Sequence, residues 1–166
     1  YNDESLSSLL YIAGRGTGSA INDADSINYN YTNSFSGFPA DAETMFTALS
    51  GKWMSVHYHN MGDSYNHLSS MFSAISSQSN VWMTTFVLAA QYGQERDTAT
   101  LTVRSAEADT IVLNVTDEMN DLLFDCPLTV KVLVDSTWQY ARAYQDGKEV
   151  SAGVVTKDGA TYLMVE

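Results

Sequence analysis

The stretch of sequence that decides the fold is Lys52-Trp53-Met54-Ser55-Val56-His57-Tyr58-His59. Its aromatic and β-branched residues predict a β-strand, and the polar segment around Gly62 predicts the loop that follows. Beyond this loop, apolar residues at helical spacing predict a helix over residues 67–75. Residues 81–83 predict another short strand, which is followed by a helix over residues 86–93. Strands that alternate with helices indicate a parallel α/β arrangement.

The residues before this stretch fit the same pattern. Residues 9–13, Leu-Leu-Tyr-Ile-Ala, predict a short buried strand. Three glycines within residues 14–18 permit an unusual backbone path after it. A polar segment rich in Ser, Asn and Tyr runs to Pro39 and predicts a long ordered loop, and Asp41 caps a helix predicted over residues 41–49. The same order of strand, loop and helix is therefore expected twice.

After Arg96 the pattern changes to short β-strands separated by turns. Asp146-Gly147 and Asp158-Gly159 are dipeptides typical of two-residue β-hairpin loops. Closely spaced short strands predict a small antiparallel β-sandwich. We therefore expect two domains, residues 1–96 with the α/β pattern and residues 97–166 as an all-β module. The strands expected in the second domain span residues 99–104, 110–115, 128–134, 138–145, 149–156 and 161–165.

The composition of the 166-residue chain is that of a globular protein, with 45% hydrophobic and 17% charged residues. Its 20 acidic residues outnumber 8 basic ones and leave a net charge of −12. The basic residues are scattered, so nucleic acid and anionic membrane surfaces are not expected partners. No apolar run approaches the roughly 18 residues of a membrane span.

The cysteine content and the polar residues bear on the compartment. Cys126 is the only cysteine, so an internal disulfide is excluded. A chain rich in Ser, Thr, Asn and Tyr and poor in Lys favours a secreted, periplasmic or cell-surface protein. The start at Tyr1, without Met, favours a processed or excised piece.

Two histidines, His57 and His59, stand two residues apart at the end of the strand predicted over residues 52–59. Side chains alternate across a strand, so both imidazoles are expected on one face, at the edge where parallel α/β folds carry catalytic groups. Either can act as a general acid or base, and His59 is the stronger candidate because it is nearer the loop. Alternatively, the pair binds a metal ion together with Asp63 or His67. A structural role in the interior is the third interpretation.

Arg15 and several aromatic residues are further candidates for the site. Arg15 is the only basic residue among the first 51, and it either binds an anionic oxygen or lies at the surface beside a turn. Trp53 and Trp82 are candidates for stacking on sugar rings, although packing in the core is the expected role of Trp53. Tyr31, with Tyr29, stands in a polar loop and is a candidate for lining a carbohydrate-binding groove.

These residues occur in an order that resembles the C-terminal half of the NodB-homology polysaccharide deacetylases, a family of carbohydrate esterases. The resemblance covers most of residues 9–145, and the β-module with Cys126-Pro127-Leu128-Thr129-Val130 resembles an appendage of some members. The other segments that carry it are Tyr11-Ile12-Ala13-Gly14-Arg15, residues 51–62, Val81-Trp82-Met83-Thr84-Thr85-Phe86 and Tyr92-Gly93-Gln94-Glu95-Arg96.

The resemblance implies both a fold and an activity. The implied fold class is α/β, part of a distorted (β/α) barrel, followed by an all-β sandwich-like module. The implied activity is removal of acetyl groups from a polysaccharide or oligosaccharide with the help of a divalent metal, usually zinc. His59 would be the general acid, Arg15 would orient the catalytic Asp, and Trp82 would help to shape the sugar pocket.

The family's Thr-Phe-Asp-Asp and His-x-x-x-His motifs, which supply the catalytic base and the metal ligands, do not occur in this sequence. The chain is therefore expected to be the C-terminal portion of such an enzyme. The metal ligands would then lie on the N-terminal half, which would be its partner. Two alternatives remain open: an independent metal hydrolase that uses His57, His59 and Asp63, and a non-catalytic carbohydrate-binding protein that uses the aromatic residues.

Overall fold

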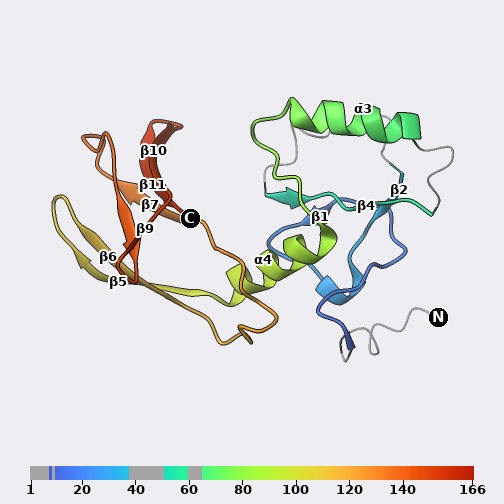
Figure 1. Ribbon diagram of the computed structural model, residues 1–166, viewed down its shortest axis with the longest axis horizontal. Coiled ribbons are helices and arrows are strands. Elements are labelled where there is room, and N and C mark those ends of the chain that lie inside the picture. Colours follow the sequence, from blue (N-terminus) through green and yellow to red (C-terminus); the bar gives the residue numbers. More distant parts are fainter. Residues whose placement is uncertain (1–7, 9, 38–50, 60–64) are drawn as a thin grey trace. The chain divides into compact units, whose positions relative to one another are not determined.

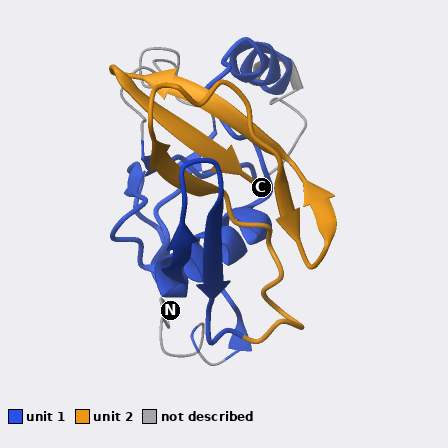
Figure 2. Cartoon of the chain, turned by 90° about the vertical axis from the view of Figure 1, so that its left-hand side faces the viewer, with its two compact units in different colours: residues 1–119 blue, residues 120–166 orange. Residues whose placement is uncertain are grey.

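The computed structural model describes residues 8, 10–37, 51–59 and 65–166 (Figure 1). The chain divides into two compact units, residues 1–119 and residues 120–166 (Figure 2). This division falls later in the chain than position 96, where the change of sequence pattern occurs. The helix expected over residues 41–49 and the loop around Gly62 lie outside the described residues.

The centre of the first unit is a set of three parallel backbone segments. Strand β2 (Phe35–Ser36) pairs with β4 (Val56–His57) in parallel, and Arg15 forms an isolated parallel bridge with Thr32. On one side, the N–H of Ser34 donates to the carbonyl of Gly18 at 2.8 Å; on the other, the N–H of Phe35 donates to the carbonyl of Ser55 at 2.9 Å. The segment 32–37 therefore lies between segments 14–18 and 55–57.

A buried amide side chain ties an antiparallel pair to this centre. Strand β1 (Asn22–Asp23) pairs with β3 (Lys52–Trp53). The Asn22 side chain donates to the carbonyls of Asn33 and Trp53, at 2.9 and 3.2 Å, and accepts from the N–H of Asn33 at 3.0 Å. One residue thus satisfies backbone groups of two separate segments. The short 3₁₀ helix η1 (Tyr29–Tyr31) follows β1.

Two α-helices of the first unit are described, α3 (Tyr65–Ser76) and α4 (Phe86–Thr98) (Figure 1). Helix α4 begins where the sequence predicts, because the hydroxyl of Thr85 accepts a hydrogen bond from the N–H of Leu88 at 3.3 Å. Near its end, Asp97 accepts a hydrogen bond from the Tyr29 hydroxyl at 2.8 Å and pairs with Arg96 at 2.6 Å. Burial, and then the contact with Asp97, raise the pKa of the Tyr29 phenol. No described helix is long and apolar enough to span a bilayer.

The β-rich character expected after Arg96 is confirmed. In the first unit, β5 (Thr100–Ala106) and β6 (Ile111–Thr116) form an antiparallel hairpin with a bulge between Val103 and Ser105. In the second unit, β7 (Val130–Val134), β10 (Ala152–Lys157) and β11 (Ala160–Val165) form an antiparallel sheet with β11 in the middle. Strands β8 (Ala143–Gln145) and β9 (Lys148–Val150) form a separate hairpin.

Both Asp-Gly dipeptides are hairpin turns, as predicted. Asp146 and Gly147 connect β8 to β9, with φ of 51° and 77°. Asp158 and Gly159 connect β10 to β11, with φ of 52° and 77°. Positive φ at both central residues is the requirement of the tight turn that matches strand twist, and Asp and Gly meet it at low steric cost.

The predicted (β/α) barrel is wrong. The sheets of the described residues have two or three strands each, most pairs are antiparallel, and none of them closes into a barrel. Of the buried strand expected over 9–13, Leu10 is helical and the residues after it are not in a strand; Leu10 and Tyr11 are each 68% exposed. Residues 81–83 are also not a strand. Short apolar runs do not specify a strand unless a neighbouring segment pairs with them.

We expect Gly93→Ala to destabilise the first unit. A Cβ at Gly93 would lie 2.9 Å from Cε1 of Tyr29, whose ring is held by its hydrogen bond to Asp97. The resulting overpacking costs about 1–3 kcal/mol, which exceeds the roughly 1 kcal/mol that alanine gains over glycine in a helix. Thermal and urea unfolding measure the change. The matched control is Gly153→Ala, because a Cβ there meets nothing within 4 Å; equal effects of the two changes would contradict the prediction.

Candidate functional site

The three parallel segments present one polar side, which we call the polar face. Partners in parallel strands point to the same side, and every second residue along each segment does so too. The pairs Arg15–Thr32 and Ser36–His57 therefore share a side. Hydrogen bonds that join Ser55, Ser34 and His57 agree with this alternation. The polar face consists of Arg15, Thr32, Ser34, Ser36, Ser55 and His57.

His57 is the most constrained ionisable group of the polar face. Its Nδ1 lies 3.0 Å from the hydroxyl of Ser34, whose side chain is almost fully buried. Burial, and after it the positive charges of Arg15 and His59, lower the pKa of His57; a backbone hydrogen bond with Phe35 acts in the opposite direction. His57 is therefore held toward its neutral form.

His59 lies beside His57, as the alternation of side chains predicts. The ring centroids are 5.1 Å apart and the ring planes meet edge to face, at 85°. His59 is exposed, whereas His57 is half-buried. The neighbouring imidazoles thus differ in environment: one faces solvent, and the other is bonded to the interior of the sheet.

Arg15 lies on segment 14–18, which is separated from the segment of His57 by segment 32–37. Its guanidinium donates to the carbonyl of Gly16 at 3.2 Å, and its charge is one of the causes that lower the pKa of His57. The structure therefore places Arg15 on the same side of the sheet as His57, although the two residues are more than 40 positions apart in sequence.

The aromatic candidates lie in other surroundings. Trp53 is half-buried and packs on Phe86 with ring centroids 5.3 Å apart, which suits the core role expected for it. Trp82 is 61% exposed and meets Tyr92 edge-on at 5.2 Å. Tyr31 hydrogen-bonds with the hydroxyl of Thr17 at 2.9 Å. Its ring lies against the backbone of Gly16, where a Cβ would be 2.8 Å from Tyr31 Cδ1.

A metal centre of the chain's own is not supported by the described residues. His57 and His59 offer two imidazoles, but one nitrogen of His57 is already engaged by Ser34. Among the residues that the structure describes, no group of three His, Cys, Asp or Glu could hold a metal ion. Asp63, the proposed third ligand, lies outside them. We therefore derive no step of the chemistry through a metal.

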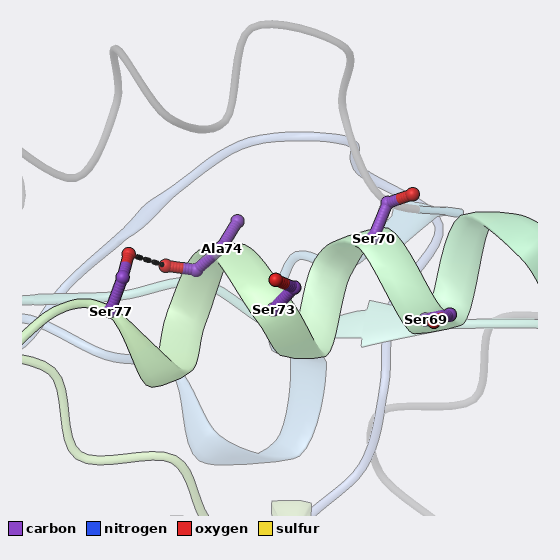
Figure 3. Close-up of a pocket in the computed structure, with 5 residues that line it drawn as sticks. All are labelled: Ser69, Ser70, Ser73, Ala74 and Ser77. Carbon is purple, nitrogen blue, oxygen red and sulfur yellow. Dashed lines mark hydrogen bonds between the residues drawn. The ribbon is translucent and has the colours of Figure 1, made fainter.

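Helix α3 carries a separate surface hollow of about 560 Å³ that the sequence did not predict (Figure 3). It is open and presents hydroxyl groups without a charged side chain, and Ser77 donates to the carbonyl of Ala74 at 2.7 Å. This hollow offers no acid, base or nucleophile of unusual reactivity. Its lining residues are Ser69, Ser70, Ser73, Ala74 and Ser77.

Sequence reasoning missed Ser34 and Ser55. A signal was present, because hydroxyl residues alternate through Thr32, Ser34 and Ser36, which is the period of one strand face. Such an alternation predicts a polar side of a sheet. It does not identify the partner across the sheet, which depends on how distant segments pair.

The pKa of His57 is expected below the ordinary value of 6.5. Because the unfolded chain then takes up the proton first, stability falls as the pH drops from 6.5 through the lower pKa of the folded protein. Arg15→Gln and His59→Asn each remove a neighbouring positive charge and should raise the pKa of His57. Proton NMR titration of the ring measures it, with Lys148→Gln in the second unit as the control for charge. An unchanged pKa in both variants would exclude this electrostatic coupling.

Comparison with known proteins gives one informative likeness. A gellan lyase from a Bacillus species is 30% identical over 200 residues, an alignment that includes 98% of this chain and 8% of that protein. The chain therefore spans less than a tenth of the length of this relative. No protein-family model matches the chain, and no solved structure matches it.

Proposed function

We propose that this chain is a segment of a polysaccharide-acting enzyme in which His59, supported by the polar face, transfers a proton at a sugar oxygen. The observation that carries the proposal is the contact of His57 with His59, on the side of the sheet to which Arg15 comes from a distant part of the sequence. The likeness to a gellan lyase supports a polysaccharide as substrate. It does not select the reaction, because the chain corresponds to a small part of that protein.

For the reaction, we infer acetyl removal. The resemblance to polysaccharide deacetylases favours it, since His59 and Arg15 stand at the positions of the general acid and of the arginine that orients the catalytic carboxylate. An exposed imidazolium can protonate the sugar oxygen as the bond from that oxygen to the acetyl carbon breaks; water that has added to this carbon completes the departing acetate. The carboxylate base and the divalent metal, usually zinc, would be supplied by another part of the enzyme. A polysaccharide substrate also favours a location outside the cytoplasm.

The division of charge between the two histidines suits this role. The lowered pKa of His57 removes a competing positive charge from the neighbourhood of His59. The exposure of His59 lets a large substrate reach its imidazole. The guanidinium of Arg15 is suited to hold a carboxylate or a developing oxyanion.

The experiment is an activity assay on the natural polypeptide that contains this chain. Acetate release from acetylated xylan and acetylated chitin oligomers is measured beside the appearance of unsaturated sugar ends from gellan. We expect acetate release, and we expect His59→Ala to lower kcat roughly 100- to 10,000-fold with little change in KM. Full activity of His59→Ala would exclude the proposal, and unsaturated ends without acetate would favour elimination chemistry.

A second histidine variant separates the rival metal hydrolase from this proposal. His67→Ala should leave acetate release unchanged if His59 acts as a general acid. If His57, His59, Asp63 or His67 instead hold a metal in this chain, then His67→Ala and His59→Ala both lower the zinc content of the purified protein. Elemental analysis measures that content directly.

A second candidate function, carbohydrate binding without catalysis, is favoured by Trp82. Its indole is 61% exposed and is supported edge-on by Tyr92, which is an arrangement suited to stacking on a sugar ring. Trp82→Ala should weaken binding to gellan or acetylated xylan about threefold to tenfold, equivalent to roughly 0.5–1.5 kcal/mol. Calorimetry measures the affinity, with the half-buried Trp138→Ala as the control. Equal affinity of the Trp82 variant and the unmodified protein would exclude this surface.

A further inference from the structure

Ser34 has a place in the polar face that the proposed function does not explain. Its side chain is 2% exposed, and its backbone N–H is bonded to the carbonyl of Gly18 at 2.8 Å. A hydroxyl so deeply buried does not reach a polysaccharide. Its hydroxyl therefore acts through hydrogen bonds with the two polar side chains that it contacts, Ser55 and His57.

Counting protons fixes the direction of these two hydrogen bonds. The hydroxyl of Ser55 donates to the hydroxyl oxygen of Ser34 at 3.1 Å. Ser34 keeps one proton of its own, and Nδ1 of His57 lies 3.0 Å away. A buried hydroxyl proton without an acceptor is costly, and Nδ1 of His57 is an acceptor within reach of the Ser34 hydroxyl. The satisfied arrangement runs from Ser55 to Ser34 and from Ser34 to Nδ1.

We propose that Ser34 is a positioning residue, which donates its hydroxyl proton to Nδ1 of His57 and so holds the neutral ring in the tautomer that carries its proton on Nε2. The competing arrangement has Nδ1–H as the donor, toward the hydroxyl of Ser34. It leaves the proton of Ser34 without a partner among the described residues. The two arrangements place the ring proton on different atoms, so they are distinguishable by spectroscopy.

This tautomer gives His57 a role beside His59. An Nδ1 that accepts a hydrogen bond cannot also carry a proton, so the contact with Ser34 opposes formation of the imidazolium. The charged groups known to face the ring, Arg15 and His59, act in the same sense. His57 is left with an Nε2–H that can donate to a neighbour or to the substrate, while the proton that is transferred resides on His59. The catalytic part of this inference rests on the proposed function; the tautomer does not.

The test is nitrogen-15 NMR of the histidine rings in the full 166-residue chain. Long-range proton–nitrogen correlations report which nitrogen of His57 is protonated in the neutral ring. We expect Nε2–H in the unmodified protein. In Ser34→Ala the ratio of Nε2–H to Nδ1–H should fall roughly threefold to tenfold, which is the factor that one ordinary hydrogen bond supplies, and the pKa of His57 should rise.

Three further variants show whether the effect belongs to the hydroxyl of Ser34. Ser34→Thr keeps the hydroxyl and should restore the Nε2–H form. Ser36→Ala removes an exposed hydroxyl two residues further along segment 32–37 and should leave the tautomer ratio of His57 unchanged. Ser55→Ala removes the donor to Ser34 but leaves the contact of Ser34 with His57, so the Nε2–H form should persist.

The outcomes are decisive even if Ser34→Ala does not fold. Nδ1–H in the neutral ring of the unmodified protein overturns the inference, and so does an unchanged tautomer ratio in a folded Ser34→Ala variant. A changed ratio in a chain whose parent polypeptide acts on no polysaccharide would support the positioning role and reject the proposed function. In an active enzyme, Ser34→Ala should also shift the acidic limb of the pH–rate profile, and Ser34→Thr should restore it.

Discussion

The structure of the first unit depends on one backbone constraint: segment 32–37 is hydrogen-bonded along both of its edges. Thr32 and Ser34 bond to segment 14–18 on one side, and Phe35 and Gly37 bond to segment 55–57 on the other. A segment fixed at both edges cannot slide by one residue without exchanging its two faces. The alternation that turns Ser34 toward His57 therefore follows from the backbone pairing, and so does the approach of Arg15 to the same side.

Polar side chains reinforce this constraint more than an apolar core does. Among the described residues of the first unit, Asn22, Thr32, Ser34, Ser55 and Glu95 are buried polar groups, whereas the buried hydrophobic ones are Met71 and Ala90. Hydrogen bonds are directional, so this set specifies register and side-chain orientation more sharply than it contributes to stability. Two side chains illustrate this directional role: Asn22 donates to the carbonyls of two backbone segments, and the hydroxyl of Tyr29 donates to Asp97. The side chains of the polar face are accordingly oriented precisely, but their hydrogen bonds contribute little to the stability of the unit.

The features that could be predicted from the sequence are local ones. Period-two alternation and Asp-Gly dipeptides located most strands after Arg96 and both hairpin turns, and Thr85 marked the start of α4. The strand expected over 138–145 is confined to β8, and the one expected over 149–156 is divided between β9 and β10. The placement of His57 and His59 on one side also needed only the geometry of a strand. The prediction of a (β/α) barrel was wrong because parallel sheets are made by segments far apart in sequence. The apolar runs at 9–13 and 81–83 do not reveal which segment would pair with them. Ser34 was missed for the same reason, since its partner is 23 residues away.

Burial decides which of the two adjacent imidazoles carries a proton. With ring centroids 5.1 Å apart, two positive charges would repel each other, and Arg15 adds to that repulsion. The ring that is less hydrated gives up its proton first, and here that ring is His57, half-buried and bonded to a buried hydroxyl. His59 is exposed to solvent. The end of β4 holds His57 toward its neutral form and leaves His59 exposed to solvent, although the two residues stand two positions apart and only His57 lies in the strand. Hydrogen-bond donation and proton transfer can thus be divided between two neighbouring imidazoles.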